Sequence, residues 1–123
     1  MEKIPQNQTD VPVAETKAEE QKLEWGPELG RMSWYDAENK IAELNAGLLE
    51  GEKPWRLPTK DELVAEFNKA GKTPIDFQDD YYWSGTALTY DLEDSDHFHI
   101  VSMDKAYVYH DEKGVEYYIR LVR

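Results

Sequence analysis

The sequence predicts an α+β domain in which two helices pack on a small antiparallel sheet. Two segments in the first half of the chain, residues 33–48 and 59–71, carry apolar residues at helical spacing. From residue 81 onward, much of the chain alternates apolar and polar residues as half-buried strands do. One short strand is expected before the first helix. Helices that are grouped apart from consecutive strands are typical of the α+β class.

The chain divides into a predicted disordered tail, residues 1–22, and one domain, residues 23–123. All fifteen aromatic residues lie from Trp25 onward, and a polar segment without aromatic residues cannot build a core. The tail lacks the apolar run of a signal peptide, and no segment is apolar enough to cross a membrane. We therefore expect no membrane insertion, while cytoplasmic, cell-surface and phage-surface locations all stay open.

The composition narrows the range of partners. The formal net charge is −12. Nucleic acid binding by counterion release requires a basic face, so we expect no nucleic acid partner. The same charge disfavours polysulfated glycans and favours a basic partner surface or a cation. Because the chain has no cysteine, it has no disulfide, thiol nucleophile or thiolate metal site.

The first predicted elements are a strand and a helix. The strand covers residues 23–25 and is expected to end at Gly26-Pro27. Ser33 then caps the helix, whose buried stripe is predicted to consist of Trp34, Ala37, Ile41, Leu44 and Leu48. We interpret Trp34 and Tyr35 as core and helix-edge residues, with ligand contact by these rings as the alternative.

The strongest structural signal is the sequence Trp55-Arg56-Leu57-Pro58, which directly precedes a helix start. Trp55 and Leu57 alternate across Arg56, and this alternation suits a short half-buried strand. Pro58 ends that strand, because proline biases the preceding residue towards an extended backbone and cannot continue the ladder.

A second helix is predicted to begin directly after this strand. Thr59 and Glu62 have the spacing of a capping box, in which each side chain accepts from the backbone N–H of the other residue. Glycine is the usual residue just past a helix end, and Gly71 has that position. The apolar face of the helix is predicted to consist of Leu63, Phe67 and Ala70.

The second half of the chain is predicted to contain four strands, at residues 81–86, 97–103, 106–110 and 115–122. Residues 111–114 have the composition of a tight turn with glycine at its end. The last two strands are therefore expected to form a hairpin.

Four pieces of the sequence resemble, in order and spacing, a bacterial branch of the C-type lectin-like domains. They are Ser33-Trp34-Tyr35-Asp36-Ala37, the Trp-Arg-Leu-Pro-Thr-x-x-Glu-Leu motif that begins at Trp55, Tyr82-Trp83-Ser84-Gly85-Thr86, and the closing residues 118–123. This branch includes the C-terminal domains of collagen-like bacterial adhesins and, more distantly, the formylglycine-generating enzymes. The resemblance spans residues 23–123 and implies a compact C-type lectin-like fold. It also implies that Trp83 lies in the core and that the first and last strands pair.

The resemblance does not carry an enzymatic activity over to this chain. Formylglycine-generating enzymes depend on a cysteine pair, and this sequence has no cysteine. Related ergothioneine-type oxidases use a histidine-rich iron site in a separate domain that has no counterpart here. We predict no catalytic residue and no cofactor. A metal-dependent enzyme that uses His97, His99 and an acid stays as a less favoured alternative.

Two sets of residues are candidate metal ligands. Between Lys72 and Lys105 the chain has eight carboxylates and no Lys or Arg, and oxygen-rich loops bind calcium. Residues 91–96 lack the glycine and final glutamate of an EF-hand loop, so a solvated acidic loop is the favoured interpretation. His97 and His99 project from one side of a strand, but an exposed strand face is favoured over a metal site. We therefore predict no metal site.

Residues 87–110 are predicted to carry the binding surface. They consist almost entirely of residue types that arise when the adenines of an Asn codon are randomised. Such mutagenesis is the mark of diversity-generating retroelements. Their variable proteins resemble this chain in fold, in the position of the variable stretch and in the closing strand. Tyr supplies large rigid contacts, and Asp, His and Ser supply adaptable hydrogen bonds. The expected contacts are Tyr90, Asp91, Asp94, Asp96, His97, His99, Tyr107 and Tyr109.

These observations predict a non-catalytic ligand-binding module, with residues 23–75 and 111–123 as scaffold. The ligand is expected to be a protein, and the acidic charge favours a basic epitope. The alternative is a fixed-specificity carbohydrate-binding adhesin domain. The residues that define the scaffold motif are Trp55, Arg56, Leu57, Pro58, Thr59, Glu62 and Trp83.

Overall fold

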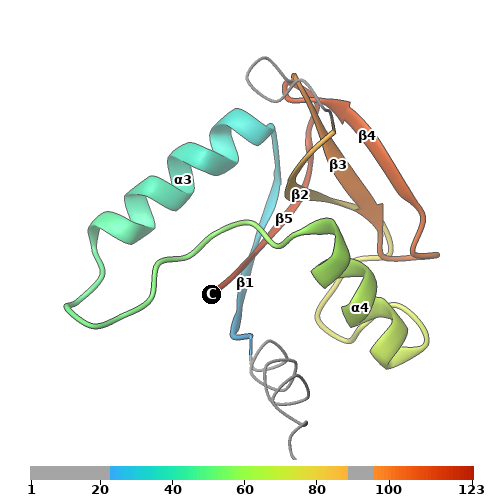
Figure 1. Ribbon diagram of the computed structural model, residues 1–123, viewed down its shortest axis with the longest axis horizontal. Helices are drawn as coiled ribbons and strands as arrows, with labels where there is room; N and C mark the ends of the chain where they lie inside the picture. Colours follow the sequence, from blue (N-terminus) through green and yellow to red (C-terminus); the bar gives the residue numbers. More distant parts are fainter. Residues whose placement is uncertain (1–22, 89–95) are drawn as a thin grey trace, which may run out of the picture.

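The computed structural model describes residues 23–88 and 96–123, which form two helices and a five-stranded sheet (Figure 1). The elements are β1 (Trp25–Met32), α3 (Trp34–Ala46), α4 (Lys60–Ala70), β2 (Tyr81–Ala87), β3 (His97–Ser102), β4 (Val108–Glu112) and β5 (Tyr117–Val122).

The strand order in the sheet is β1-β5-β2-β3-β4. Neighbouring strands are antiparallel, except that β2 and β5 pair in parallel. The predicted α+β class is therefore confirmed, with one parallel contact in the centre of the sheet. The predicted disordered tail lies outside the described residues.

Apolar side chains are buried on both faces of the sheet. The core against α3 contains Trp83, and the core against α4 contains Tyr82. These two residues are neighbours in β2, and successive side chains of a strand point to opposite faces. In Figure 1 the two helices lie on either side of β1 and β5. Trp83 is fully buried, so its predicted place in the core is confirmed.

Helix α3 begins as predicted and ends earlier. The Ser33 hydroxyl accepts from the backbone N–H of Asp36 at 3.1 Å, which satisfies one of the unpaired donors of the first turn. Ala37 and Ile41 are buried. The predicted stripe was too long: Leu44 is 38% exposed, and the helix ends at Ala46, before Leu48.

Helix α4 has both predicted ends. Thr59 and Glu62 form the capping box, and Gly71 ends the helix in the left-handed conformation at φ 74°. Leu63 is fully buried and Phe67 packs against the same core. Ala70, predicted on this face, is exposed, so the buried face of α4 is shorter than predicted.

Strand β1 does not end at Gly26-Pro27, as predicted, but continues to Met32. Proline cannot donate to a ladder, but it is tolerated at a sheet edge, and β1 is an edge strand. Two register shifts against β5 accommodate the irregular stretch. A Cβ at Gly26 would lie 2.9 Å from a ring carbon of Trp55, so this glycine allows the close approach of the indole.

The expected hairpin between the last two strands is not formed. β4 pairs with β3, whereas β5 lies between β1 and β2. Ile119, Leu121 and Val122 of β5 are all fully buried, and a strand that is apolar on both faces needs a central position. The side chains of β4 are mostly exposed, as suits an edge strand. Both strands also begin two residues later than predicted.

The two ends of the domain meet, as the resemblance implied. Glu24 and Arg123 exchange backbone hydrogen bonds of 2.8 and 3.0 Å, and the Arg123 guanidinium pairs with the Glu24 carboxylate. Its central carbon lies 4.1 Å from the centroid of the Trp55 ring. The predicted strand at residues 55–57 is reduced to one bridge, between Arg56 and Val122.

Candidate functional site

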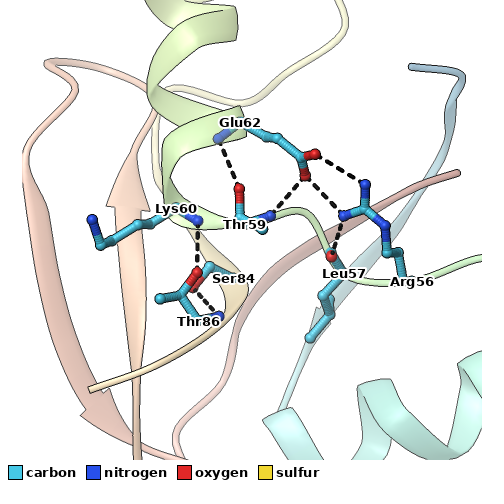
Figure 2. Close-up of polar contacts among 7 residues, drawn as sticks. All are labelled: Arg56, Leu57, Thr59, Lys60, Glu62, Ser84 and Thr86. Atoms are coloured by element: carbon cyan, nitrogen blue, oxygen red, sulfur yellow. Dashed lines mark hydrogen bonds and ion pairs between the residues drawn. The ribbon is translucent and has the colours of Figure 1, made fainter. Parts of the chain in front are cut away.

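The scaffold motif is built around one carboxylate, that of Glu62 (Figure 2). Its Oε1 accepts from the backbone N–H of Thr59 at 2.9 Å and from Arg56 Nη1 at 2.8 Å. Its Oε2 accepts from Arg56 Nη2 at 2.9 Å, so the ion pair is bidentate. Partial burial alone would raise the pKa of Glu62, but the hydrogen bonds from Arg56 and Thr59 outweigh it and hold the pKa below its usual value.

The same junction fixes an irregular part of β2. Trp83 pairs with Ile100, and the next paired residues are Ala87 and Phe98, so β2 carries extra residues between these pairs. The backbone N–H of Lys60 donates to the Thr86 hydroxyl at 3.0 Å (Figure 2). The bulge is therefore tied to the start of α4.

A buried hydroxyl extends this connection to β3. Ser84 is fully buried, and its hydroxyl donates to the His99 carbonyl at 2.8 Å. It also accepts from the backbone N–H of Thr86 at 3.0 Å (Figure 2). The backbone of β3, which carries part of the predicted surface, is thus connected to the start of α4 through three hydrogen bonds in series.

The predicted contact residues are only partly described. Tyr90, Asp91 and Asp94 lie outside the described residues. Asp96 precedes β3 and is exposed, and His97 and His99 are half-buried on β3. The remaining two lie next to and on the edge strand β4: Tyr107 is 53% exposed and Tyr109 is 51% exposed.

The structure places the described contact residues on two faces rather than on one. Tyr109 lies directly across from Ile100, on the face that packs against α3. The centroid of its ring lies 5.9 Å from the ring centroid of Tyr81 and 6.3 Å from that of Tyr107. His97 and His99 alternate with Ile100 and therefore project from the opposite face.

We name the three rings of Tyr81, Tyr107 and Tyr109 the tyrosine cluster. Tyr81 was not among the predicted contacts, because the sequence at the start of β2 has only the alternating pattern of a half-buried strand. Its ring also lies 6.0 Å from that of Tyr117. The proximity becomes visible only when β4 is known to pair with β3 and not with β5.

A charge-assisted hydrogen bond beside the tyrosine cluster fixes the end of β4. The Tyr117 hydroxyl donates to the Asp111 carboxylate. This hydrogen bond holds the pKa of Asp111 below its usual value. Burial, together with the same carboxylate, raises the pKa of Tyr117 to about 12. Asp111 lies across from Phe98 in the β3–β4 pair. The Phe98 ring packs against the indole of Trp34, with the two ring centroids 4.3 Å apart. That contact supports the core and helix-edge interpretation of Trp34.

The three histidines form two different contacts on the other face. His99 Nδ1 lies 3.2 Å from the Thr86 carbonyl, so Nδ1 of this ring carries the proton. His97 Nδ1 lies 2.9 Å from His110 Nδ1. The sequence spacing suggested His97 and His99 as a pair, whereas in the structure His97 contacts His110 on the neighbouring strand.

These histidines and the acidic segment are the two sets of candidate metal ligands. Within residues 23–88 and 96–123, no three His, Asp or Glu side chains are close enough to hold a metal ion together. Residues 91, 93 and 94 of the acidic loop lie outside that range. That this loop is solvated and holds no calcium therefore stays a prediction.

A hollow of about 230 Å³ is lined by none of the predicted contacts that the structure describes. Trp25 and Phe77 line it with Arg120, and the rings of Trp25 and Phe77 meet edge to face at 5.5 Å. The Arg120 guanidinium lies 4.9 Å from the Phe77 ring centroid and donates to the Asp76 carbonyl. No sequence pattern predicted the hollow, because its residues come from β1, β5 and the connection before β2.

Two comparisons with known proteins complete the description of the site. The sequence model of a protein family described as the Lcl C-terminal domain matches residues 14–123. A search of curated proteins found no match. Among the helices of the described residues, none has the length and apolar character needed to cross a membrane.

Proposed function

Because the chain belongs to the Lcl C-terminal domain family, a family of ligand-binding C-type lectin-like domains, we propose that it is a non-catalytic module that recognises a protein ligand. The proposed binding surface lies within residues 87–110. Its described part consists of Asp96, His97, His99, Tyr107 and Tyr109.

The observation that carries the proposal is a separation of roles along β3 and β4. Ile100 and Val101 point into the two cores and fix the backbone, while Tyr107 and Tyr109 are more than half exposed. Residues held on paired strands lose little conformational freedom when they bind, which reduces the entropic cost of association. The scaffold contacts of Arg56, Thr59 and Glu62 involve none of the exposed contact residues.

Tyr107 and Tyr109, the two exposed members of the tyrosine cluster, are proposed as the main contact area for a protein ligand, with the Tyr81 ring beside Tyr109. The rings of Tyr107 and Tyr109 are exposed beside an edge strand, and tyrosine combines a large apolar area with a hydrogen-bonding hydroxyl. Asp80 and Asp104 lie near the cluster in the sequence but pair with Arg31 and Lys105, so the electrostatic argument rests on the net charge of the chain, which is −12. A basic epitope on the partner would therefore associate faster than an acidic one.

We further propose that the chain is the variable protein of a diversity-generating retroelement. The residue types in 87–110 support this proposal, but they occur at buried as well as exposed positions. Ile100 and Val101 belong to the same set of residue types, yet each fills a core. If the proposal holds, variation is restricted to exposed positions such as Tyr107 and Tyr109, and the codons of the two core residues stay constant.

The encoding DNA and its neighbourhood test this proposal directly. The expected result is a nearby reverse transcriptase gene together with a near-copy of the coding stretch that differs only at adenines. The differing codons should include those of Tyr107 and Tyr109 and should exclude those of Ile100 and Val101. Finding neither the gene nor the near-copy would refute the retroelement assignment.

A negative result would leave the alternative of a fixed-specificity carbohydrate-binding adhesin. That alternative predicts binding on a glycan array and loss of this binding in Tyr107→Ala. A protein-binding module would give no glycan signal above that of the variant. The two arms therefore separate the ligand classes even while the ligand itself is unidentified.

A further inference from the structure

The sheet has two edge strands, which differ in how they are protected against pairing with another chain. β1 contains Pro27, which has no N–H to donate, and its register against β5 shifts twice. Proline and bulges both hinder the addition of a further strand. β4 has no proline and pairs with β3 without a register shift. Its outer side is the free edge of the sheet (Figure 1).

The ladder between β3 and β4 fixes which backbone groups of β4 point to this free edge. The Ser102 N–H donates to the Tyr107 carbonyl at 2.8 Å. Along an antiparallel strand, successive residues direct their backbone groups alternately to one side and to the other. Residues 109 and 111 therefore bond to β3, as residue 107 does, whereas Val108, His110 and Glu112 direct their N–H and C=O groups outward.

Val108 and His110 carry the backbone groups that are free at this edge. Glu112 is already engaged, because its N–H donates to the Asp111 carboxylate at 2.7 Å and its carbonyl accepts from the Val115 N–H at 3.1 Å. Within residues 23–88 and 96–123, no group bonds the backbone N–H and C=O of Val108 or His110. Unpaired backbone groups at the spacing of a ladder are a template for another strand.

We propose that this edge pairs antiparallel with the β4 edge of a second copy of the chain, about a two-fold axis at Tyr109. In this register Val108 of each copy lies across from His110 of the other and exchanges two hydrogen bonds with it. The resulting bonds use every free backbone group of the edge. The two Tyr109 side chains lie directly opposite each other, and such aromatic pairs stabilise strand pairing. The interface is isologous and closed, so it produces a dimer and not a fibre.

The neighbouring two-fold registers do not use these backbone groups fully. A register centred on Val108 pairs His110 with Ala106, whose N–H already donates to the Ser102 carbonyl at 2.7 Å. A register centred on His110 pairs Val108 with Glu112, whose N–H and carbonyl are engaged within the chain. The hydrogen bonds of the single chain therefore select the register centred on Tyr109.

The side chains along the edge fit the same register. Tyr107, Val108 and Tyr109 are all at least 40% exposed, so the edge carries three consecutive large apolar side chains. Asp111 lies across from Tyr107 of the second copy, and no two carboxylates therefore oppose each other directly. Because side chains project from the faces of a sheet, pairing at its edge leaves both Tyr109 rings accessible and joins the two tyrosine clusters in one row. The value of this row for binding rests on the proposed function, whereas the pairing itself does not and is tested without a ligand.

Cysteine cross-linking tests the register, because the chain has no cysteine of its own. Opposed residues that exchange no hydrogen bonds have Cα atoms about 4.5 Å apart, and a disulfide spans about 4.4–6.8 Å. Tyr109→Cys should therefore form a covalent dimer under mild oxidation. Val108→Cys is the matched control on the same strand. The two copies of residue 108 are diagonal neighbours about 7–8 Å apart, and a separation above about 7 Å is not bridged.

Sedimentation of the full chain at protein concentrations up to about 1 mM measures the association. We expect a monomer–dimer equilibrium that shifts towards the dimer as NaCl is added, since salt screens the repulsion between two copies of net charge −12. Val108→Pro removes an outward N–H, a change that edge strands tolerate, and should weaken the dimer at least about tenfold. Val108→Ala is the matched control, because it keeps the N–H, and it should stay within about threefold of the parent.

A second variant makes the test independent of proline. Tyr109→Asp sets two carboxylates opposite each other at the two-fold axis and should dissociate the dimer. Tyr35→Asp is its control, because Tyr35 on α3 has the same exposed fraction of 51% and the substitution adds the same charge. Circular dichroism of each variant shows whether the fold is retained.

Three results would overturn the proposal. One is a parent chain that stays monomeric over the whole concentration range, which would leave the edge to a strand of a different protein. Another is equal cross-linking of Tyr109→Cys and Val108→Cys. The third is that Val108→Pro and Tyr109→Asp both associate as tightly as their controls.

Discussion

At the scale of single residues, Glu62 makes one contact that the local sequence predicts and another that depends on the tertiary fold. Its role in the capping box could be predicted from the spacing to Thr59 alone, because the box lies within four residues. Its bidentate pair with Arg56 could not, because the geometry depends on how the chain turns at Pro58. The pair holds the end of the bridge segment against the first turn of α4.

Glu62→Gln isolates the charge of this pair. Gln can still accept from Thr59, but it loses the charge-assisted bonds to Arg56, so we expect a cost of about 1 kcal/mol at neutral pH. Since folding lowers the pKa of Glu62 from its ordinary value near 4.5, this contribution is present above that pH. It is lost as the pH falls through the lower pKa of the folded state.

Urea denaturation at several pH values measures this effect. The difference between Glu62→Gln and the parent should be largest near pH 7 and should close in acid. Asp61→Asn is the control, because Asp61 lies in the same first turn and its ion pair is with Lys60 rather than with Arg56. An equal pH dependence in the control would show that the helix dipole, and not the ion pair, is responsible.

At the scale of elements, helices were predicted better than strand pairings. The caps at Ser33, Thr59 and Gly71 are set by residues within one turn, so the sequence carries them directly. β5 lies between β1 and β2 because its apolar side chains must be buried on both faces of the sheet. Which strand takes that position is a property of the whole sheet. The same reason explains why the tyrosine cluster was missed: it joins β2 to β4 across β3.

Gly26→Ala tests why β1 passes through Gly26-Pro27. The added methyl group would lie 2.9 Å from the Trp55 ring, so the indole or the strand must shift. We expect a loss of about 1–3 kcal/mol, as in other overpacked sites. Gly114→Ala is the matched control, because no atom lies within 4 Å of its new Cβ. A thermal melt in which both variants lose the same stability would show that backbone freedom, not the indole contact, selects Gly26.

At the scale of the whole molecule, the domain places its apolar residues in two cores and leaves the outer part of the β3–β4 pair exposed. The fold class could be predicted from the sequence, because it follows from the order of periodic segments. The division of the contact residues between two faces could not, because it depends on the register of β3 with β4. That register sets His97 beside His110 and turns Tyr109 towards Tyr81.

This division leads to a comparison between one buried side chain and three side chains that are half-buried or exposed. The triple variant His97→Ala, Tyr107→Ala, Tyr109→Ala removes two contacts of the tyrosine cluster and one histidine, and aromatic pairs contribute about 0.5–1.5 kcal/mol each. Ile100→Ala, on the same hairpin, removes a side chain that is 3% exposed, and such truncations cost about 2–5 kcal/mol. We therefore expect the single variant to melt at a lower temperature than the triple variant. The opposite order would mean that the exposed side chains hold the hairpin together, and the surface could then not change its residues without loss of the fold.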